Sequence, residues 1–165
     1  MDEINLHLGC GKNDWPNFIG IDGGNYPHVK WHDVTNLHYE DNSISFIYAS
    51  HLIAYFDRQE IASILKEWFR VLKPNAVLRL STPDWDFLRT LPRPLIGPLY
   101  GKMNNPPIYH KTVYSYDELY QVLRSAGFIN IERSDKVQSI LETDDQSGST
   151  YDGKLISLNV QCIKP

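Results

Sequence analysis

The stretch Ile4–Lys12 near the N-terminus constrains the fold of this chain more than any other. Apolar and polar residues alternate up to Leu8, which predicts a half-buried strand that ends at Gly9-Cys10-Gly11. Glycine at positions 9 and 11 allows a sharp turn and leaves no Cβ between the backbone and a ligand. A second apolar run, Phe18–Ile21, stops at Asp22. This arrangement fits a nucleoside site, because a carboxylate at the end of the second strand can accept hydrogen bonds from ribose hydroxyls. Taken alone, the same residues also fit a tight turn followed by a loop acid.

Length and composition set the outer limits of the interpretation. A chain of 165 residues with 42% hydrophobic residues predicts one globular domain, residues 1–165. The formal net charge of -4 argues against a basic surface for nucleic acid, and no apolar run reaches membrane length. The first predicted strand leaves no room for a signal peptide, and the two cysteines cannot form a disulfide framework. We therefore expect a cytoplasmic protein, and the sequence leaves its oligomeric state open.

The connection between the first two predicted strands is unusually short. A parallel crossover normally needs a dozen or more residues and a helix, whereas Lys12–Asn17 can form at most one turn. Either the first crossover helix is reduced to a loop, or the two strands are not neighbours. The chain also lacks the third glycine and the acid about 20 residues beyond it that mark a dinucleotide site. A nicotinamide cofactor is therefore disfavoured.

The next segments predict strands that end in polar residues and one clear helix. Residues 28–34 predict a short strand that includes Asp33, and residues 44–49 predict a buried strand that leads into Ser50-His51. Asp57 and Glu60 are in positions to cap a helix over residues 57–72, whose apolar residues recur at helical spacing. Pro74 ends this helix and Asn75 suits a left-handed turn. Residues 76–81 then predict a strand that ends at Thr82-Pro83-Asp84.

The second half of the chain begins with an irregular segment, Leu91–Tyr116. Its prolines exclude a regular helix, and several tyrosines are interleaved with them. A capped helix then begins at Ser115 and ends at Gly127, followed by strands from Ile129, at 137–141 and at 156–162. Strands that alternate with helices predict an α/β fold: a Rossmann-like, doubly wound, mostly parallel sheet with an antiparallel C-terminal edge and a first crossover helix that is reduced or missing. Ligands of such sheets bind at the carboxyl ends of the strands, where the glycines and acids lie.

Several motifs resemble those of the class I S-adenosylmethionine-dependent methyltransferases. Leu8-Gly9-Cys10-Gly11 is similar to the first motif of that superfamily. The later motifs are resembled, in order, by Tyr48-Ala49-Ser50-His51, Arg70-Val71-Leu72-Lys73-Pro74-Asn75, Ser81-Thr82-Pro83-Asp84, His110-Lys111-Thr112 and Ala126-Gly127-Phe128. The resemblance covers nearly the whole chain. It is strongest to short methyltransferases associated with bacterial surface-polysaccharide biosynthesis.

The resemblance implies S-adenosylmethionine as cofactor, with S-adenosylhomocysteine as product. Asp22 would bind the ribose hydroxyls, Asp33 would accept from the adenine amino group, and the Val34 N–H would meet the ring. The full set of expected cofactor residues is Gly9, Cys10, Gly11, Lys12, Asp22, Gly23, Asp33, Val34 and Ser50. This chain departs from the family pattern at Gly23, Asn75 and Ala54-Tyr55. The last departure replaces a Glu-His pair near the expected acceptor site.

For the methyl acceptor we expect a site under a lid formed by residues 91–116. The candidate catalytic residues are His51, His110 and Asp84, and the candidate substrate-binding residues are Tyr109 and Tyr114. Tyr109 and His110 would face the pocket, with His51 opposite. The alternatives remain open: His51 and Asp84 also fit capping roles, and the lid also fits a crossover that merely covers the sheet. The histidine spacings do not indicate a metal site.

The sequence thus predicts a methyltransferase that acts on a small-molecule or saccharide-linked acceptor. One alternative is a catalytically degenerate module that binds S-adenosylmethionine or S-adenosylhomocysteine and acts through partners. A third possibility is a dehydrogenase or sugar-nucleotide enzyme, which the missing third glycine counts against.

Overall fold

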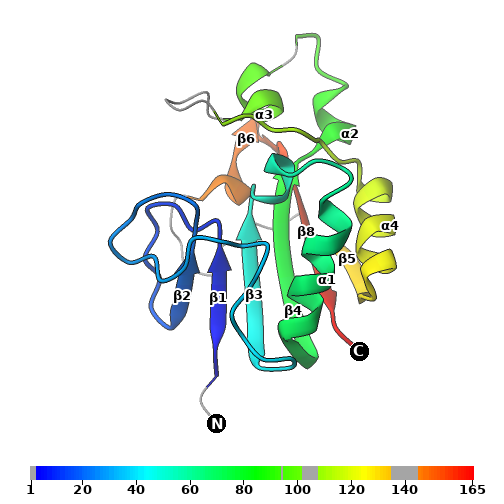
Figure 1. Cartoon of the computed structure of the whole chain (residues 1–165). Coiled ribbons are helices and arrows are strands. Elements are labelled where there is room, and N and C mark those ends of the chain that lie inside the picture. The colour runs from blue at the N-terminus through cyan, green and yellow to red at the C-terminus, as the bar shows by residue number, and fades with distance from the viewer. Residues whose placement is uncertain (1–2, 94, 102–107, 135–144) are drawn as a thin grey trace.

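The computed structural model describes residues 3–93, 95–101, 108–134 and 145–165. Its central element is a six-stranded sheet in the order β2-β1-β3-β4-β8-β5 (Figure 1). The strands of this sheet are β1 Asn5–Leu8, β2 Phe18–Ile21, β3 Ile44–Ser50, β4 Leu72–Pro83, β5 Ile129–Ser134 and β8 Ser157–Ile163. A separate hairpin pairs β6 (Thr150–Tyr151) with β7 (Lys154–Leu155).

The pairing directions confirm the predicted α/β fold. Strands β2, β1, β3 and β4 are parallel, and β8 is antiparallel to both β4 and β5. The antiparallel strand is the C-terminal one, as expected, and it lies between β4 and β5. Its apolar positions Leu158, Val160 and Cys162 are fully buried in the core, in agreement with the predicted alternation.

The short crossover between β1 and β2 joins two neighbouring strands. This confirms the alternative in which the first crossover helix is reduced to a loop. Residues 9–17 contain no helix. Trp15 from this loop instead stacks on His7, with ring centroids 4.1 Å apart, and also contacts Phe18 and Tyr48. His7 lies between the core residues Leu6 and Leu8 in β1, so its ring points to the opposite face of the sheet. One tryptophan therefore covers part of a face that a crossover helix would otherwise cover.

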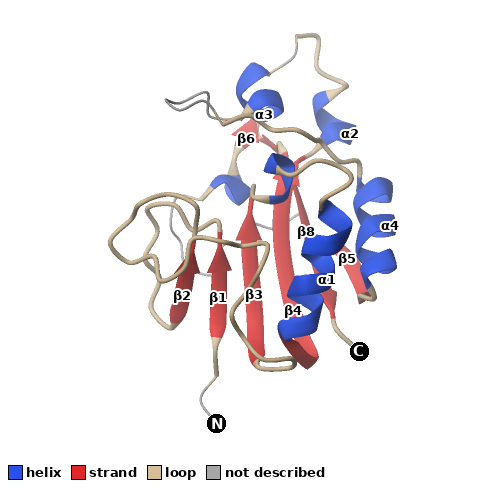
Figure 2. Ribbon diagram, viewed as in Figure 1, coloured by secondary structure: helices blue, strands red, loops and turns tan. Residues whose placement is uncertain are grey.

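Two helices pack on the other face of the sheet (Figure 2): α1 (Ile61–Val71) and α4 (Tyr116–Ala126). The hydrogen bonds predicted between Asp57 and Glu60 are present, but the regular helix begins only at Ile61. The capping box of α4 is complete, and the helix ends at Gly127 with φ 109°. Asn75 has φ 64°, as its left-handed turn requires.

Two sequence predictions are wrong. The strand expected at residues 28–34 is reduced to one bridge, in which Trp31 pairs with Ile21. The irregular segment contains a five-residue helix, α3 (Ile96–Tyr100), although Pro98 lies within it. The strand expected at 137–141 lies outside the described residues.

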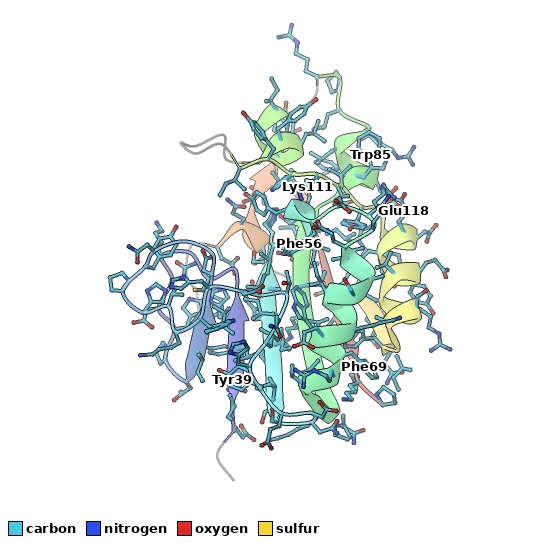
Figure 3. The ribbon with its side chains drawn as sticks, in the orientation of Figure 1. Tyr39, Phe56, Phe69, Trp85, Lys111 and Glu118 are labelled. Atoms are coloured by element: carbon cyan, nitrogen blue, oxygen red, sulfur yellow. The ribbon has the colours of Figure 1, made fainter. Side chains whose placement is uncertain are left out.

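Short elements form a cap over the carboxyl ends of the parallel strands. Figure 1 shows α2 (Trp85–Leu88), α3 and β6 above the points of β3 and β4. Two short 3₁₀ helices, Ile53–Tyr55 and Gln146–Gly148, lie below them. In Figure 3 the labelled Phe56 and Lys111 lie between this cap and α1. Within the described part of the chain, no helix has the length and apolarity to cross a membrane.

Candidate functional site

The glycine turn after β1 has the geometry that the sequence predicted. Gly9 and Gly11 have φ angles of 67° and 54°, values that favour glycine. A Cβ at Gly9 would lie 3.1 Å from Leu52, so this position also needs glycine for close packing. A Cβ at Gly11 would meet nothing within 4 Å. The backbone at Gly11 is therefore open to a ligand.

Asp22, at the end of β2, is bound to the glycine turn. One carboxylate oxygen accepts from the Gly11 N–H at 2.8 Å, and the other accepts from the Gly24 N–H at 2.7 Å. Each carboxylate oxygen has a further lone pair, so both oxygens retain a site for a ligand hydroxyl. The acid and the glycine turn, separated in sequence, thus form one surface.

The Asp33-Val34 loop lies beside this surface, because the Trp31 carbonyl accepts from the Asp22 N–H. Thr35 donates to the Asp33 carboxylate from its hydroxyl and its backbone N–H, and these bonds lower the pKa of Asp33. Asp33 is thus ionised at neutral pH. The carbonyl of Val34 accepts from the buried Trp68 indole at 2.8 Å, which fixes the loop to α1.

The other expected cofactor residues differ in their surroundings. Lys12 and Gly23 are exposed, and a Cβ at Gly23 would meet open space. Cys10 is buried and lies 3.6 Å from the Nε2 atom of His28, a neighbour that the sequence did not reveal. Burial, followed by the charge of Asp22, raises the pKa of the Cys10 thiol to about 12, so it stays protonated. The Ser50 hydroxyl is bonded to that of Ser81.

A cavity of about 240 Å³ lies where His51, which follows β3, meets residues of α3 and of the chain before β8. It is lined by His51, Gly97, Pro98, Gly101, His110, Gln146, Ser149 and Ile156. None of these residues belongs to the glycine turn or to the two acidic loops. The residues that line the cavity are therefore distinct from the predicted cofactor residues.

The structure brings His51 and His110 to this one cavity, although 59 positions separate them (110 minus 51). The Nε2 atom of His51 lies 2.8 Å from the Ser157 hydroxyl, and the residue has φ 52°. The Nδ1 atom of His110 lies 3.0 Å from the Pro98 carbonyl oxygen. Tyr55 packs edge-on against the His110 ring at 4.7 Å.

Three other predicted acceptor residues do not line the cavity. Asp84 is buried, caps α2 through bonds from Asp86 and Phe87, and forms a 2.6 Å ion pair with Arg133. Tyr114 is 1% exposed and belongs to the hydrophobic core. Tyr109 is 48% exposed and is not among the lining residues, although it is adjacent to His110. The geometry therefore gives Asp84 and Tyr114 structural roles.

Sequence reasoning missed the lining residues that come from the polar loop before β8. Gln146 and Ser149 are placed by Asp145, which accepts a hydrogen bond from the buried Tyr48 hydroxyl and further bonds from Ser147. The Asn159 amide also donates to the Ser147 carbonyl. No local pattern indicates where this loop lies, because the bond between Tyr48 and Asp145 joins residues far apart in the sequence. Among the described residues, no group of three or more His, Cys, Asp or Glu side chains could hold a metal ion.

Comparisons with known proteins agree with this geometry. Residues 13–80 match a family model described as a methyltransferase domain. A search of curated proteins found no match. A solved S-adenosylmethionine-dependent methyltransferase from Methanosarcina mazei is 17% identical, with a TM-score of 0.64 over 99% of this chain and 92% of that chain.

Two further solved structures have the same fold. A methyltransferase from Archaeoglobus fulgidus is 14% identical, with a TM-score of 0.67 over 98% of this chain and 86% of that one. Human N-acetylserotonin methyltransferase in complex with S-adenosylmethionine is 12% identical, with a TM-score of 0.62 over 98% of this chain and 47% of that one. This chain thus has the fold of the class I S-adenosylmethionine-dependent methyltransferases. The family match and these structures support S-adenosylmethionine as the cofactor.

Proposed function

We propose that this protein is an S-adenosylmethionine-dependent methyltransferase that acts on a small-molecule acceptor, with saccharides among the candidates. The observation that carries the proposal is the contact between Asp22 and the Gly11 N–H. It joins the open glycine turn and a ribose-binding carboxylate at the carboxyl edge of the sheet, where ligands of this fold bind. We further propose that residues 1–165 form one such domain and that it functions in the cytoplasm.

The residues of the site fit the cofactor. The open backbone at Gly11 suits the methionine part, the remaining lone pairs of Asp22 suit two ribose hydroxyls, and ionised Asp33 suits the adenine amino group. When bound, S-adenosylmethionine supplies a methyl group on a sulfonium. The protein then has to hold the acceptor in line with that methyl group, and positioning alone can supply much of the rate.

We propose the cavity lined by His51 and His110 as the acceptor site, since His51 follows β3 at the carboxyl edge of the sheet. His51 and His110 line it, so the replacement of a Glu-His pair by Ala54-Tyr55 does not leave the site without an ionisable group. Ile96, Tyr100 and Tyr109 are exposed, and each is adjacent in sequence to a lining residue. Such flat or apolar side chains suit a sugar ring or another small ring.

Calorimetric titration with S-adenosylmethionine, S-adenosylhomocysteine and NAD tests this proposal. We expect both S-adenosyl ligands to bind and NAD not to bind. Asp22→Ala removes the charged acceptor of two hydroxyls and should cost roughly 1.5–3 kcal/mol of affinity, which is about 10- to 150-fold in Kd. Asp14→Ala is the matched control, because Asp14 is an exposed acid in the same loop region.

A second variant separates binding from folding. Asp22 also holds the turn through Gly11 and Gly24, so its loss affects stability as well. Asp33→Asn removes a charge on a loop that Trp68 fixes independently, and it places an amide donor where the adenine amino group also donates. We expect weaker S-adenosylhomocysteine binding and only a small loss of stability, since the amide oxygen can still accept from Thr35 without the charge. Unchanged affinity in both the Asp22 and Asp33 variants, or tight binding of NAD, contradicts the proposal.

A further inference from the structure

The hydrogen bond at Nδ1 fixes the tautomer of His110. The Pro98 carbonyl oxygen 3.0 Å away can only accept a hydrogen bond, so Nδ1 must carry the hydrogen. In the neutral imidazole the lone pair is then on Nε2. Burial lowers the pKa of His110, which keeps the ring neutral near pH 7.

The Nε2 atom of His110 is buried and has no hydrogen-bond partner among the described residues. It lies beside Gly101, where a Cβ would be 3.0 Å from Nε2, and both residues line the cavity. Gly101 therefore keeps this nitrogen clear of a side chain. A buried acceptor without a donor is unfavourable, so a ligand that donates a hydrogen bond here regains free energy on binding.

The second histidine of the cavity, His51, carries a hydrogen on its Nε2 atom, whereas His110 carries a lone pair there. The Ser157 hydroxyl donates its only hydrogen to the Gln146 carbonyl at 2.8 Å. It must therefore accept from His51, whose Nε2 carries a hydrogen directed at Ser157. The Nε2–H group of His51 is thus already engaged in a hydrogen bond to Ser157. Of the two Nε2 atoms at the cavity, the one in His110 is the available acceptor.

The charge and size of the cavity further restrict the class of ligand that it can bind. The described residues that line it include no Lys, Arg, Asp or Glu. A phosphate or carboxylate would lose its hydration there without gaining a cation, which is costly. The volume of about 240 Å³ is below that of a typical drug-sized pocket, about 300–1,000 Å³, and suits a single ring.

We infer that the methyl acceptor is uncharged at its reacting end and carries an O–H or N–H group that donates to His110 Nε2. This inference rests on the proposed methyltransferase function. The acceptor atom forms the new bond to the methyl carbon, the electron pair of the broken carbon–sulfur bond stays on sulfur, and the acceptor proton passes to His110 Nε2. Water then takes that proton, which restores neutral His110. His110 is thus the proposed catalytic base.

The first test measures the tautomer of His110 by long-range ¹H–¹⁵N NMR on the whole protein without ligand near pH 7.5. We expect His110 to be protonated at Nδ1 and unprotonated at Nε2, with the resonance assigned by its absence from His110→Phe. A protonated Nε2 overturns the inference. This readout needs no cofactor, so it is independent of the proposed function, which S-adenosylhomocysteine binding tests separately.

The second test uses matched probes on protein saturated with S-adenosylhomocysteine. We expect phenol and methyl glucoside to shift the His110 Nε2 resonance, and phenyl phosphate and glucose 6-phosphate to leave it unchanged. His110→Phe should bind phenol about 3- to 10-fold more weakly, the value of one hydrogen bond, with unchanged affinity for S-adenosylhomocysteine. Lys111→Ala, a change at the adjacent exposed residue, should bind phenol normally. Preference for the phosphate esters, or no shift with either uncharged probe, overturns the inference.

Discussion

His7 is a buried ionisable group outside the proposed chemistry. It is 2% exposed in β1 and stacks on Trp15. Burial, with a smaller contribution from the charge of His28, lowers the pKa of His7 to about 4. Unfolding returns the ring to water, where its pKa is about 6.5. His7 is therefore neutral in the fold over a pH range in which the unfolded chain takes up a proton.

This difference predicts a loss of stability in mild acid. Between about pH 6.5 and 4 the unfolded state binds more protons than the folded state, so the free energy of unfolding falls as the pH falls. The contribution of His7 is on the order of 3 kcal/mol when complete. We expect His7→Phe, which keeps an aromatic ring against Trp15, to show a smaller loss between pH 7 and pH 4.5 in urea titrations. Equal losses in the two proteins would contradict the role of His7, since His110 titrates in both and cancels.

Helix α1 supports the loop after β2, residues 33–39, and also contributes to the core. Its Glu67 carboxylate accepts from the Leu37 N–H at 2.8 Å and pairs with Arg70. Arg70 in turn donates to the Leu37 and Tyr39 carbonyls. Figure 3 shows Tyr39 on the side of the sheet that α1 covers. Polar side chains of α1 thus hold the backbone of residues 37–39.

Removal of Glu67 therefore predicts a local opening of this loop. In Glu67→Ala the Leu37 N–H and the Arg70 guanidinium lose a charged partner, which is worth about 1.5–3 kcal/mol. We expect the Leu37 amide to exchange roughly 10- to 100-fold faster and S-adenosylhomocysteine to bind more weakly. Lys66→Ala, on the exposed face of the same helix, is the control for both measurements. Unchanged exchange at Leu37 would show that α1 does not hold the loop.

Elements with local signals could be predicted from the sequence. The α4 capping box and its terminal Gly127 are set by residues within one turn of the helix, and β8 follows from alternation alone. The strand expected at 28–34 failed because pairing needs a partner, and contact with β2 is limited to the Trp31 bridge and the bond from the Lys30 N–H to the Gly20 carbonyl. The start of α1 moved to Ile61 because the capping bonds of Asp57 close a turn before the regular helix.

In the candidate site, too, residues with a local signal could be predicted and residues placed by long-range contacts could not. The glycine turn and Asp22 could be predicted because each follows its own strand directly, and parallel strands bring their carboxyl ends together. Of the residues that line the cavity, only His51 and His110 could be predicted from the sequence. Gln146 reaches it through Asp145 and the buried Tyr48, a contact between residues about a hundred positions apart that no spacing encodes. The sequence left the role of Asp84 open because a strand-end acid fits capping and catalysis equally well, and in the structure Asp84 caps α2.

The described part of the molecule has a six-stranded sheet and few helices. Lys164 is therefore important for joining the sheet to the helix layer. Its ammonium, just after β8, donates to the carbonyls of Phe69 and Arg70 at the end of α1 and to the Asn42 side chain. It also lies 4.7 Å from the centre of the Phe69 ring. A positive charge at a helix C-terminus is favourable in itself. One side chain therefore ties the last strand, the first long helix and the loop before β3 into one unit.

Lys164→Met tests this connection, because methionine retains much of the apolar stem and removes the donors. We expect a loss of about 2–3 kcal/mol in the free energy of unfolding, since the helix carbonyls lose a charged donor. For a chain of this size that corresponds to a fall in Tm of roughly 4–12 °C. The exposed Lys154→Met is the control and should leave Tm unchanged. Because Lys164 lies at the end of the sheet opposite to the glycine turn, S-adenosylhomocysteine affinity at a temperature where both proteins are folded should stay the same. A Tm equal to that of the parent protein would show that the layers are joined without Lys164.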